Sequence, residues 1–326
     1  MSCRIMSLAV AALLLVAGAT GSLASPQGKK IAHLTLTVQN EYIAALVKSF
    51  ADTATKDGMQ VTTFANNFDP ALQAQQIDDA IARKFDMIVL EPASETGIVP
   101  AATRAHQAGI PILYLIGEPQ PGTENLYLSN VGDDQAELGQ IAGASIVKAL
   151  HENGRDGGNV AAITGSLQEG VARLRLEKFK DALKADPKIK LVAIEDAAWD
   201  TVKSQTIAGE LFARFAGQGG LQAMYGMADN QAIAIVSAAE AAGLPVGSGP
   251  KDLIVVGSNC VPQTVPAIRA GKLYSSATQI PTFLGKRAAE AAADYFSGKQ
   301  VAKVIRLPVE VIDRQNIDKW AGPCTF

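Results

Sequence analysis

Residues 30–64 read KIAHLTLTVQNEYIAALVKSFADTATKDGMQVTTF and decide the fold. The apolar run at 31–37 predicts a buried strand, the stretch at 42–57 predicts a helix, and the run at 60–64 predicts a second strand. Gly58 lies where that helix must end before the next strand begins. A strand, a helix and a strand in this order are typical of a parallel sheet covered by helices.

The same alternation continues along the chain. In the first half, further strands are predicted at 86–90, 112–116 and 126–128, and helices at 71–84 and 98–107. The second half repeats the plan, with strands predicted at 159–164, 190–194, 223–226, 253–257, 273–278 and 305–312, and helices at 134–151, 171–185, 201–215, 231–242, 265–271 and 282–298. Two parallel sheets without a Pro/Gly/Ser-rich linker between them imply two lobes joined by short crossings. Ligands of such sheets bind beyond the carboxyl ends of the strands, so two facing sheets predict a cleft.

The first residues indicate export. Arg4 is followed by an apolar run at 8–17, and Ser22 and Ala24 are small residues at the spacing that a signal peptidase accepts before Ser25. The apolar run is shorter than the roughly 20 residues of a membrane span. Residues 1–24 are therefore predicted to be a cleaved signal peptide, and the mature protein is expected in the periplasm.

Composition narrows the function classes. The chain has 326 residues, of which 48% are apolar, enough to bury two cores. A net charge of -3 offers no basic surface for nucleic acid. After cleavage only Cys260 and Cys324 remain. They can form one disulfide in an oxidising compartment or stay as two separate thiols, and the sequence leaves both open.

Motifs of cofactor and catalytic sites are missing from the sequence. No glycine follows the first strand at 38–40, where a dinucleotide fingerprint would need one. GSLQEG at 165–170 lacks the Lys-Ser/Thr of a phosphate loop and indicates an ordinary strand-to-helix turn. His33, His106 and His151 are isolated, without metal-ligand spacing. We therefore expect no cofactor, no metal and no enzymatic activity.

Polar and aromatic side chains follow several of the predicted strands. Amides and a guanidinium can satisfy several hydroxyls, and Tyr and Trp offer flat faces to sugar C–H groups. The candidates are Asn40, Tyr42, Arg173, Trp199, Asn259 and Gln279. Structural alternatives exist: Asn40 as a helix cap, Arg173 as a solvated helix charge and Trp199 as a filler of the lobe surface.

The chain resembles the ribose-type periplasmic binding proteins, which share a family with the ligand domains of lac-repressor-type regulators. The resemblance covers residues 30–317 and rests on AHLTLTVQN at 32–40, AGIPI at 108–112, VGDD at 131–134, RLR at 173–175, VVGSN at 255–259 and ATQIP at 277–281. A regulator would begin with a helix-turn-helix, where this chain has the predicted signal peptide.

The resemblance implies the type I periplasmic binding protein fold: two doubly wound parallel-sheet lobes joined by three hinge crossings. The crossings are expected near 131–133, 279–281 and 307–308. The N-terminal lobe would contain 29–132 and 280–308, and the C-terminal lobe 133–279 and 309–326.

The resemblance also implies a binding site. Asn40, Arg173 and Gln279 match the hydrogen-bonding positions of the family, and Tyr42 and Trp199 match its stacking aromatics. Trp199 and Arg173 are expected to face the cleft from the second lobe. Asn259 stands where the family usually has an aspartate. Asp229 matches the second residue of an Asn-Asp pair, with Ala228 in place of the first, and a helix cap is its alternative role.

Three further departures make the expected pocket less charged than a ribose pocket. Ile116 and Gly117 replace an Asp-Arg pair, and Leu36 replaces a small polar residue. With Ala228, they are expected to line one end of the pocket and to indicate a ligand without carboxylate or phosphate.

The function implied is that of the periplasmic solute-binding component of an ABC transporter. The ligand would be a small neutral polyhydroxy solute, a sugar or sugar alcohol. The partners would be a membrane permease and its ATPase, and a monomer is expected. A receptor of the same fold serving a chemotaxis or sensor-kinase system is one alternative. An exported hydrolase is another, without a nucleophile, base or metal set to support it.

Overall fold

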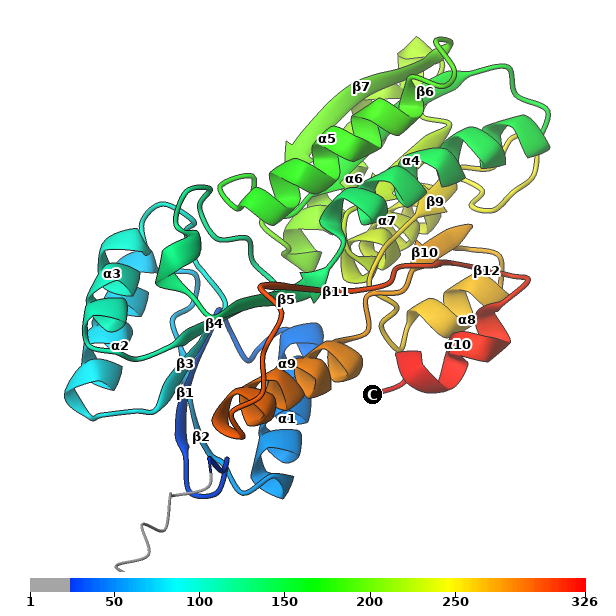
Figure 1. The fold of residues 1–326 in the computed structure, drawn as a ribbon. Helices are drawn as coiled ribbons and strands as arrows, with labels where there is room; N and C mark the ends of the chain where they lie inside the picture. The colour runs from blue at the N-terminus through cyan, green and yellow to red at the C-terminus, as the bar shows by residue number, and fades with distance from the viewer. Residues whose placement is uncertain (1–23) are drawn as a thin grey trace, which may run out of the picture.

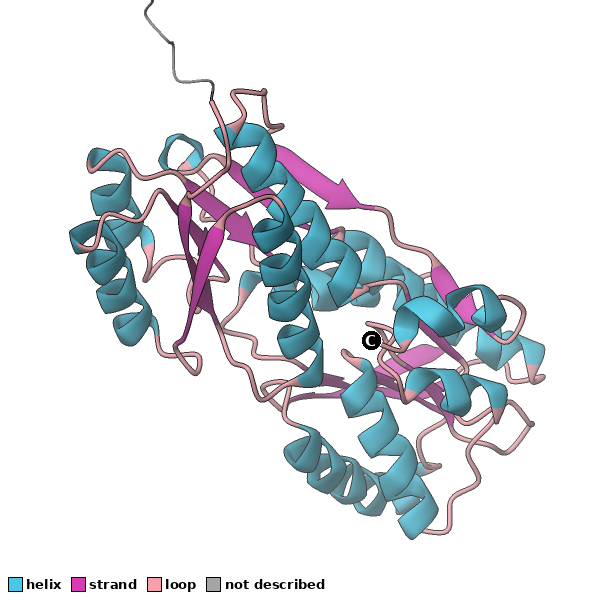
Figure 2. Cartoon of the chain, turned by 90° about the horizontal axis from the view of Figure 1, so that it is seen from below, coloured by secondary structure: helices cyan, strands magenta, loops and turns pink. Residues whose placement is uncertain are grey.

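The computed structural model describes residues 24–326, so the predicted signal peptide, apart from its last residue, lies outside the described residues. The described chain forms two lobes (Figure 1), and each lobe is a six-stranded sheet with helices on both faces. A second view, from below, shows the two sheets with helices between them and the solvent (Figure 2). The predicted two-lobed α/β architecture is confirmed.

The N-terminal lobe has a wholly parallel sheet in the order β11-β5-β4-β3-β1-β2. Its strands are β1 (Lys30–Thr35), β2 (Gln60–Ala65), β3 (Met87–Leu90), β4 (Ile112–Leu115), β5 (Ser129–Asp133) and β11 (Val304–Leu307). Helices α1 (Glu41–Lys56) and α9 (Pro281–Phe296) cover one face, and α2 (Pro70–Ala82) and α3 (Val99–Gln107) cover the other. The apolar strands β3 and β4 are buried throughout because helices cover both faces.

The C-terminal lobe has the order β12-β10-β9-β8-β6-β7. Its strands are β6 (Gly158–Thr164), β7 (Ile189–Asp196), β8 (Ala223–Gly226), β9 (Ile254–Val256), β10 (Ser275–Ala277) and β12 (Val311–Asp313). Helices α4 (Gln135–Glu152) and α5 (Gly170–Leu183) cover one face. The other face carries α6 (Thr201–Phe215), α7 (Asp229–Ala241), α8 (Thr264–Arg269) and α10 (Ile317–Cys324).

The chain passes between the two lobes three times. It crosses from β5 to α4, returns from β10 to α9, and crosses again from β11 to β12. Each lobe therefore contains segments that are distant in the sequence, as the mixed colours within each lobe show (Figure 1). The carboxyl ends of the strands that precede these crossings lie where the lobes meet.

Some predicted elements were wrong. Residues Glu124–Leu126 form a short 3-10 helix, and the strand expected at 126–128 is β5 instead. The single strand expected at 305–312 is two strands in different sheets, separated at Pro308, which has no N–H to donate to a ladder. One of them, β12, is antiparallel to β10, so the second sheet is not wholly parallel. Helix α10 was not predicted at all.

Cys260 and Cys324 are joined in a disulfide, with their Cα atoms 5.1 Å apart. Both side chains are fully buried, and the bond ties the end of α10 to the loop after β9. The two cysteines are 64 positions apart in the sequence. Closing a loop of that size stabilises the folded state by about 4 kcal/mol on the chain-entropy model.

None of the helices within residues 24–326 combines the length and the apolar character that crossing a membrane would require.

Candidate ligand-binding cleft

A cavity of about 90 Å³ lies between the lobes, and we call it the cleft cavity. From the N-terminal lobe it is lined by Leu36, Thr37, Asn40, Glu41, Tyr42, Ile43, Phe68 and Ile116. From the C-terminal lobe it is lined by Glu169, Val171, Arg175, Trp199, Ala228, Asn230, Asn259 and Val261, and Gln279 joins them from the crossing before α9. The residues come from the loops after strands and from the amino-terminal parts of the helices that follow, which is where open parallel sheets bind ligands.

Five of the seven predicted site residues line this cavity: Asn40, Tyr42, Trp199, Asn259 and Gln279. Leu36, Ile116 and Ala228 line it as well. Gly117 lines a smaller adjoining cavity of about 20 Å³. Arg173 and Asp229 lie elsewhere.

Asn40 and Tyr42 begin the first helix. Asn40 caps α1, because its side-chain oxygen accepts from the backbone N–H of Tyr42 at 2.9 Å and of Ile43 at 3.2 Å. Asn40 is therefore the N-cap of α1, which was its alternative role, and capping uses only the oxygen of its side chain. Tyr42 is buried, and its hydroxyl has no hydrogen-bond partner among the described residues. Burial raises the pKa of Tyr42 well above its ordinary value, so the hydroxyl is a neutral donor.

The prediction that Arg173 faces the cleft is wrong, because Arg173 does not line the cleft cavity. Its Nη2 donates to Oε2 of Glu95 at 2.7 Å, and its Nη1 donates to the carbonyls of Leu167 and Gln168 at 3.1 and 2.7 Å. The side chain is half exposed and bridges the two lobes outside the cleft cavity. Successive residues of a helix are rotated by about 100°, so a residue two positions away faces nearly the opposite side.

Arg175 takes the position expected of Arg173. It is 2% exposed, and its Nη1 donates to the carbonyl of Met227 at 2.8 Å. Its Nε donates to Oε1 of Gln135 at 3.1 Å, and its Nη2 donates to that oxygen and to Oε1 of Gln279 at 3.3 Å. A signal existed in the sequence, since Arg175 shares the helical phase of Ala172 and Phe179 on the buried face of α5.

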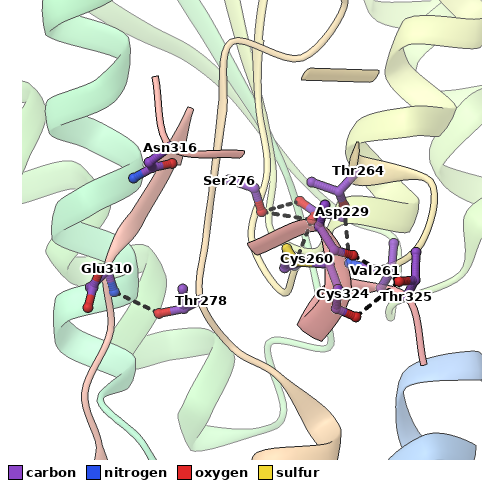
Figure 3. The surroundings of a disulfide bond; sticks show 12 residues. Asp229, Cys260, Val261, Thr264, Ser276, Thr278, Glu310, Asn316, Cys324 and Thr325 are labelled. Carbon is purple, nitrogen blue, oxygen red and sulfur yellow. Dashed lines mark hydrogen bonds between the residues drawn. A yellow bond between two sulfur atoms is a disulfide. The ribbon is translucent and has the colours of Figure 1, made fainter. Parts of the chain in front are cut away.

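The prediction for Asp229 is also wrong, because Asp229 does not line the cleft cavity and lies beside the disulfide (Figure 3). Its carboxylate is fully buried beside the disulfide and accepts from Oγ of Ser276 at 2.9 and 2.7 Å, from Oγ1 of Thr264, and from the backbone N–H of Cys260 at 2.8 Å. Burial raises the pKa of Asp229 to about 7, against the lowering effect of the hydroxyl donors. Asp229 is the first residue of α7 and holds the loop after β9 against β10.

Asn259 and Gln279 form an amide pair on the cavity wall. Nδ2 of Asn259 donates to Oε1 of Gln279 at 2.8 Å, and Arg175 shares the same oxygen. Oδ1 of Asn259 is buried without a partner among the described residues. The backbone of Asn259 has φ 107, in the left-handed region that residues other than glycine rarely adopt, and Asn259 lines the cavity.

Trp199 and Glu169 form a second pair. The indole Nε1 donates to Oε1 and Oε2 of Glu169 at 3.1 and 3.3 Å. The indole lies directly against Gly165, where a Cβ would come within 2.0 Å of the ring, so glycine is required there. The Arg175 guanidinium is 5.7 Å from the ring centroid. Burial raises the pKa of Glu169 to about 7, and the indole hydrogen bond opposes that rise. Glu169 was not predicted as a site residue.

Within residues 24–326, no three His, Cys, Asp or Glu side chains gather closely enough to hold a metal ion.

The family described as "Periplasmic binding protein domain" matches residues 31–300. This chain belongs to that family. The ribose import binding protein of Bacillus subtilis (strain 168) is 27% identical over 276 residues, covering 84% of each chain. The D-allose-binding periplasmic protein of Escherichia coli (strain K12) is 25% identical over 280 residues, covering 83% of this chain and 86% of the relative. These relatives are binding proteins.

The crystal structure of a galactofuranose binding protein superposes with a TM-score of 0.84 at 20% identity, covering 90% of this chain and 97% of that one. The similarity extends over both lobes and the crossings between them. This periplasmic binding protein therefore has the same two-lobed fold as that crystal structure.

Proposed function

We propose that the protein is the periplasmic solute-binding component of an ABC transporter, and that its ligand is a small polyhydroxy solute, a sugar or sugar alcohol. One observation carries the proposal: Tyr42 and Asn259, which line the cleft cavity together with Trp199, each have a buried polar atom, the Tyr42 hydroxyl and Oδ1 of Asn259, without a partner among the described residues. Buried polar groups are normally hydrogen-bonded, so a ligand with hydroxyls would supply the hydrogen bonds that these two atoms lack. Relatives named for ribose and D-allose support a sugar-like ligand.

Transport requires that the ligand control the arrangement of the lobes. The lobes contact each other through the Arg173–Glu95 ion pair and through Gln263, whose Nε2 donates to Oε2 of Glu41 at 3.2 Å. A ligand that touches both cavity walls favours this closed arrangement by its differential affinity for it. A permease and its ATPase then recognise the closed shape.

Binding is favoured over catalysis by the residues around the cavity. Of the described residues that line it, none is a serine, cysteine or histidine. Two have hydroxyls: Thr37, whose hydroxyl accepts from the backbone N–H of Gln39 at 3.1 Å, and Tyr42, whose pKa is well above its ordinary value. An exported hydrolase would need a nucleophile or an activated water here. A same-fold receptor for chemotaxis remains compatible with the same ligand site and differs only in its partner.

A thermal-shift screen over pentoses, hexoses and polyols tests the proposal. A specific ligand at 100 times its dissociation constant stabilises the protein by about 2.7 kcal/mol. We expect one group of these compounds to raise the melting temperature and to be recovered chemically unchanged. A screen in which no sugar or polyol stabilises the protein, or in which the ligand is consumed, would contradict it. Mass spectrometry of a periplasmic extract should find a mature chain that begins at Ser25.

A further inference from the structure

We propose that the ligand carries an amino group beside its hydroxyls, and that Glu169 selects it. This inference rests on the proposed function and replaces the neutral solute that the sequence predicts with a singly cationic one. It starts from the charges around the cleft cavity, which are Glu41, Glu169 and Arg175 among the described residues.

The arginines near Glu169 are engaged elsewhere. Arg175 directs its guanidinium to Gln135, Gln279 and the Met227 carbonyl. Arg173 directs its own to Glu95 and to two backbone carbonyls. Neither guanidinium donates a hydrogen bond to Glu169, so the acidic wall of the cavity has no cation bonded to it from the described chain.

Glu169 itself is 8% exposed, and its carboxylate accepts from a single neutral donor, the indole of Trp199. A buried carboxylate without a cationic partner is unfavourable, because desolvation is not repaid. Burial accordingly raises the pKa of Glu169 to about 7, and the nearby Asp196 carboxylate adds to the rise. An ammonium group in the cavity would supply the missing counter-charge and further N–H donors for both carboxylate oxygens.

The rest of the cavity fits the hydroxyls of such a ligand. Leu36 and Ile116 share both adjoining cavities with Glu169 and offer no hydrogen-bonding side chain that would compete for the carboxylate. Tyr42 and Asn259, each with a buried polar atom that has no partner in the described chain, line the same cavity. Glu41, exposed at the rim of the cavity, adds a second negative charge that favours an approaching cation and disfavours an anion.

Calorimetry with matched pairs of compounds tests this inference. The pairs are 1-amino-1-deoxysorbitol with sorbitol, glucosamine with glucose, and an aminocyclitol with myo-inositol, each titrated at pH 7.5. For the pair that fits the cavity, we expect the amine to bind at least tenfold more tightly than its hydroxyl counterpart. Glu169→Gln keeps the shape of the side chain and should abolish that preference. Glu195→Gln is the control, because it removes a carboxylate of the same lobe that is paired with Arg214 and lines neither cavity.

The pH dependence gives a second readout. The titratable groups and charges around Glu169 are Asp196, Arg173 and Arg175, together with Glu91, Glu95 and Glu118 across the adjoining cavity, and the indole of Trp199 donates to it. Protonated Glu169 cannot pair with an ammonium group, so binding of the amine should be several-fold weaker at pH 6 than at pH 7.5. In Glu169→Gln that difference should disappear. Melting curves of the two variants should confirm that both are folded.

Three results would overturn the inference. If the hydroxyl compound binds the native protein as tightly as its amine, the ligand is neutral, and the proposed function stands without this refinement. If Glu169→Gln keeps the preference for the amine, another residue selects it. If no sugar, polyol or amine binds, the proposed function fails and the inference fails with it.

Discussion

The two walls of the cleft cavity differ in chemistry. Four of the eight residues in the wall from the N-terminal lobe are apolar, namely Leu36, Ile43, Phe68 and Ile116, and its one charged residue, Glu41, is exposed. The wall from the C-terminal lobe has as many polar residues, but two of them, Glu169 and Arg175, are buried charged groups. Polar groups fix the orientation of a ligand, and apolar groups exclude water. The C-terminal lobe therefore orients the ligand, and the N-terminal lobe covers it.

The walls also differ in how their side chains are held. Arg175, Gln279 and Asn259 hydrogen-bond to one another, and Trp199 bonds Glu169. On the other wall, Asn40 bonds only to the backbone of its own helix. The C-terminal wall is thus assembled before any ligand arrives, which lowers the entropy cost of binding there. We expect the first contacts of the ligand to be with the C-terminal lobe.

Removing Arg175 should break the C-terminal wall. Arg175→Met leaves the buried oxygens of Gln135 and Gln279 and the Met227 carbonyl without this donor, so we expect the free energy of unfolding to fall by about 3 kcal/mol. Ligand affinity should fall as well. Urea unfolding and calorimetry measure the two effects. Arg173→Met is the matched control on the same helix, and because its side chain is half exposed it should lower stability by less than about 1 kcal/mol. Equal losses in both variants would contradict the distinction.

The aromatic residues of the two walls offer a direct comparison. Trp199→Ala should weaken ligand binding by about 2 kcal/mol, as loss of an aromatic anchor in a buried site commonly does. Phe68→Ala, on the other wall and 40% exposed, should weaken it by less than half as much. Calorimetry of both variants measures the difference. If the loss is greater for Phe68→Ala, the N-terminal lobe orients the ligand and the assignment of the walls is reversed.

Tyr42 contributes a buried hydroxyl to the N-terminal wall. Tyr42→Phe removes a buried hydroxyl that has no partner in the described chain, so the stability of the unliganded protein should be unchanged or slightly higher. Affinity should fall by about 1 kcal/mol, because the ligand loses one hydrogen bond. Thermal melting without ligand and calorimetry separate these effects. A fall in stability with intact affinity would show that the hydroxyl serves the core of the lobe.

The smallest effect is expected where the walls meet. Glu95→Gln removes the ion pair with Arg173 that links the lobes. The guanidinium is half exposed, so the pair contributes at most about 1 kcal/mol to the closed arrangement, and less at high salt. Affinity of the native protein should therefore weaken slightly between 0.05 and about 0.5 M salt, and that of the variant should change less. An identical salt response in both would leave the pair without a role in closure.

The architecture was predictable because apolar strands and amphipathic helices alternate with little ambiguity. The disagreements concern segments whose structure depends on partners distant in the sequence. Strand β12 is three residues long and pairs antiparallel with β10. No pattern in the residues of β12 itself predicts this pairing. The disulfide likewise depends on α10, whose approach to the β9 loop is a property of the folded lobe.

The site divides in the same way. Asn259 and Gln279 lie in loops just after strands, and Asn40 and Tyr42 lie at the start of the helix after β1, so the topology brings all four to the cavity. The resemblance to the family predicts Arg173 as a site residue from its position in the motif. The position of each arginine around helix α5 shows instead that Arg175 is on the buried face and Arg173 is not.

The sequence around Glu169 and Asp229 predicts their roles less clearly. Each acidic residue stands at the start of a helix, where a carboxylate ordinarily caps or remains solvated. Only the folded chain shows that Glu169 faces the indole of Trp199 and that Asp229 turns toward Thr264 and Ser276.

The three crossings have a consequence for the order in which the protein acquires its structure. The edge strand β11 and helix α9 of the first lobe, and β12 and α10 of the second, all come from residues after 280. A nascent chain that emerges from its amino end cannot complete either sheet until nearly its whole length is free. Neither lobe can mature as an early, independent unit, unlike the contiguous domains that fold one after another during synthesis.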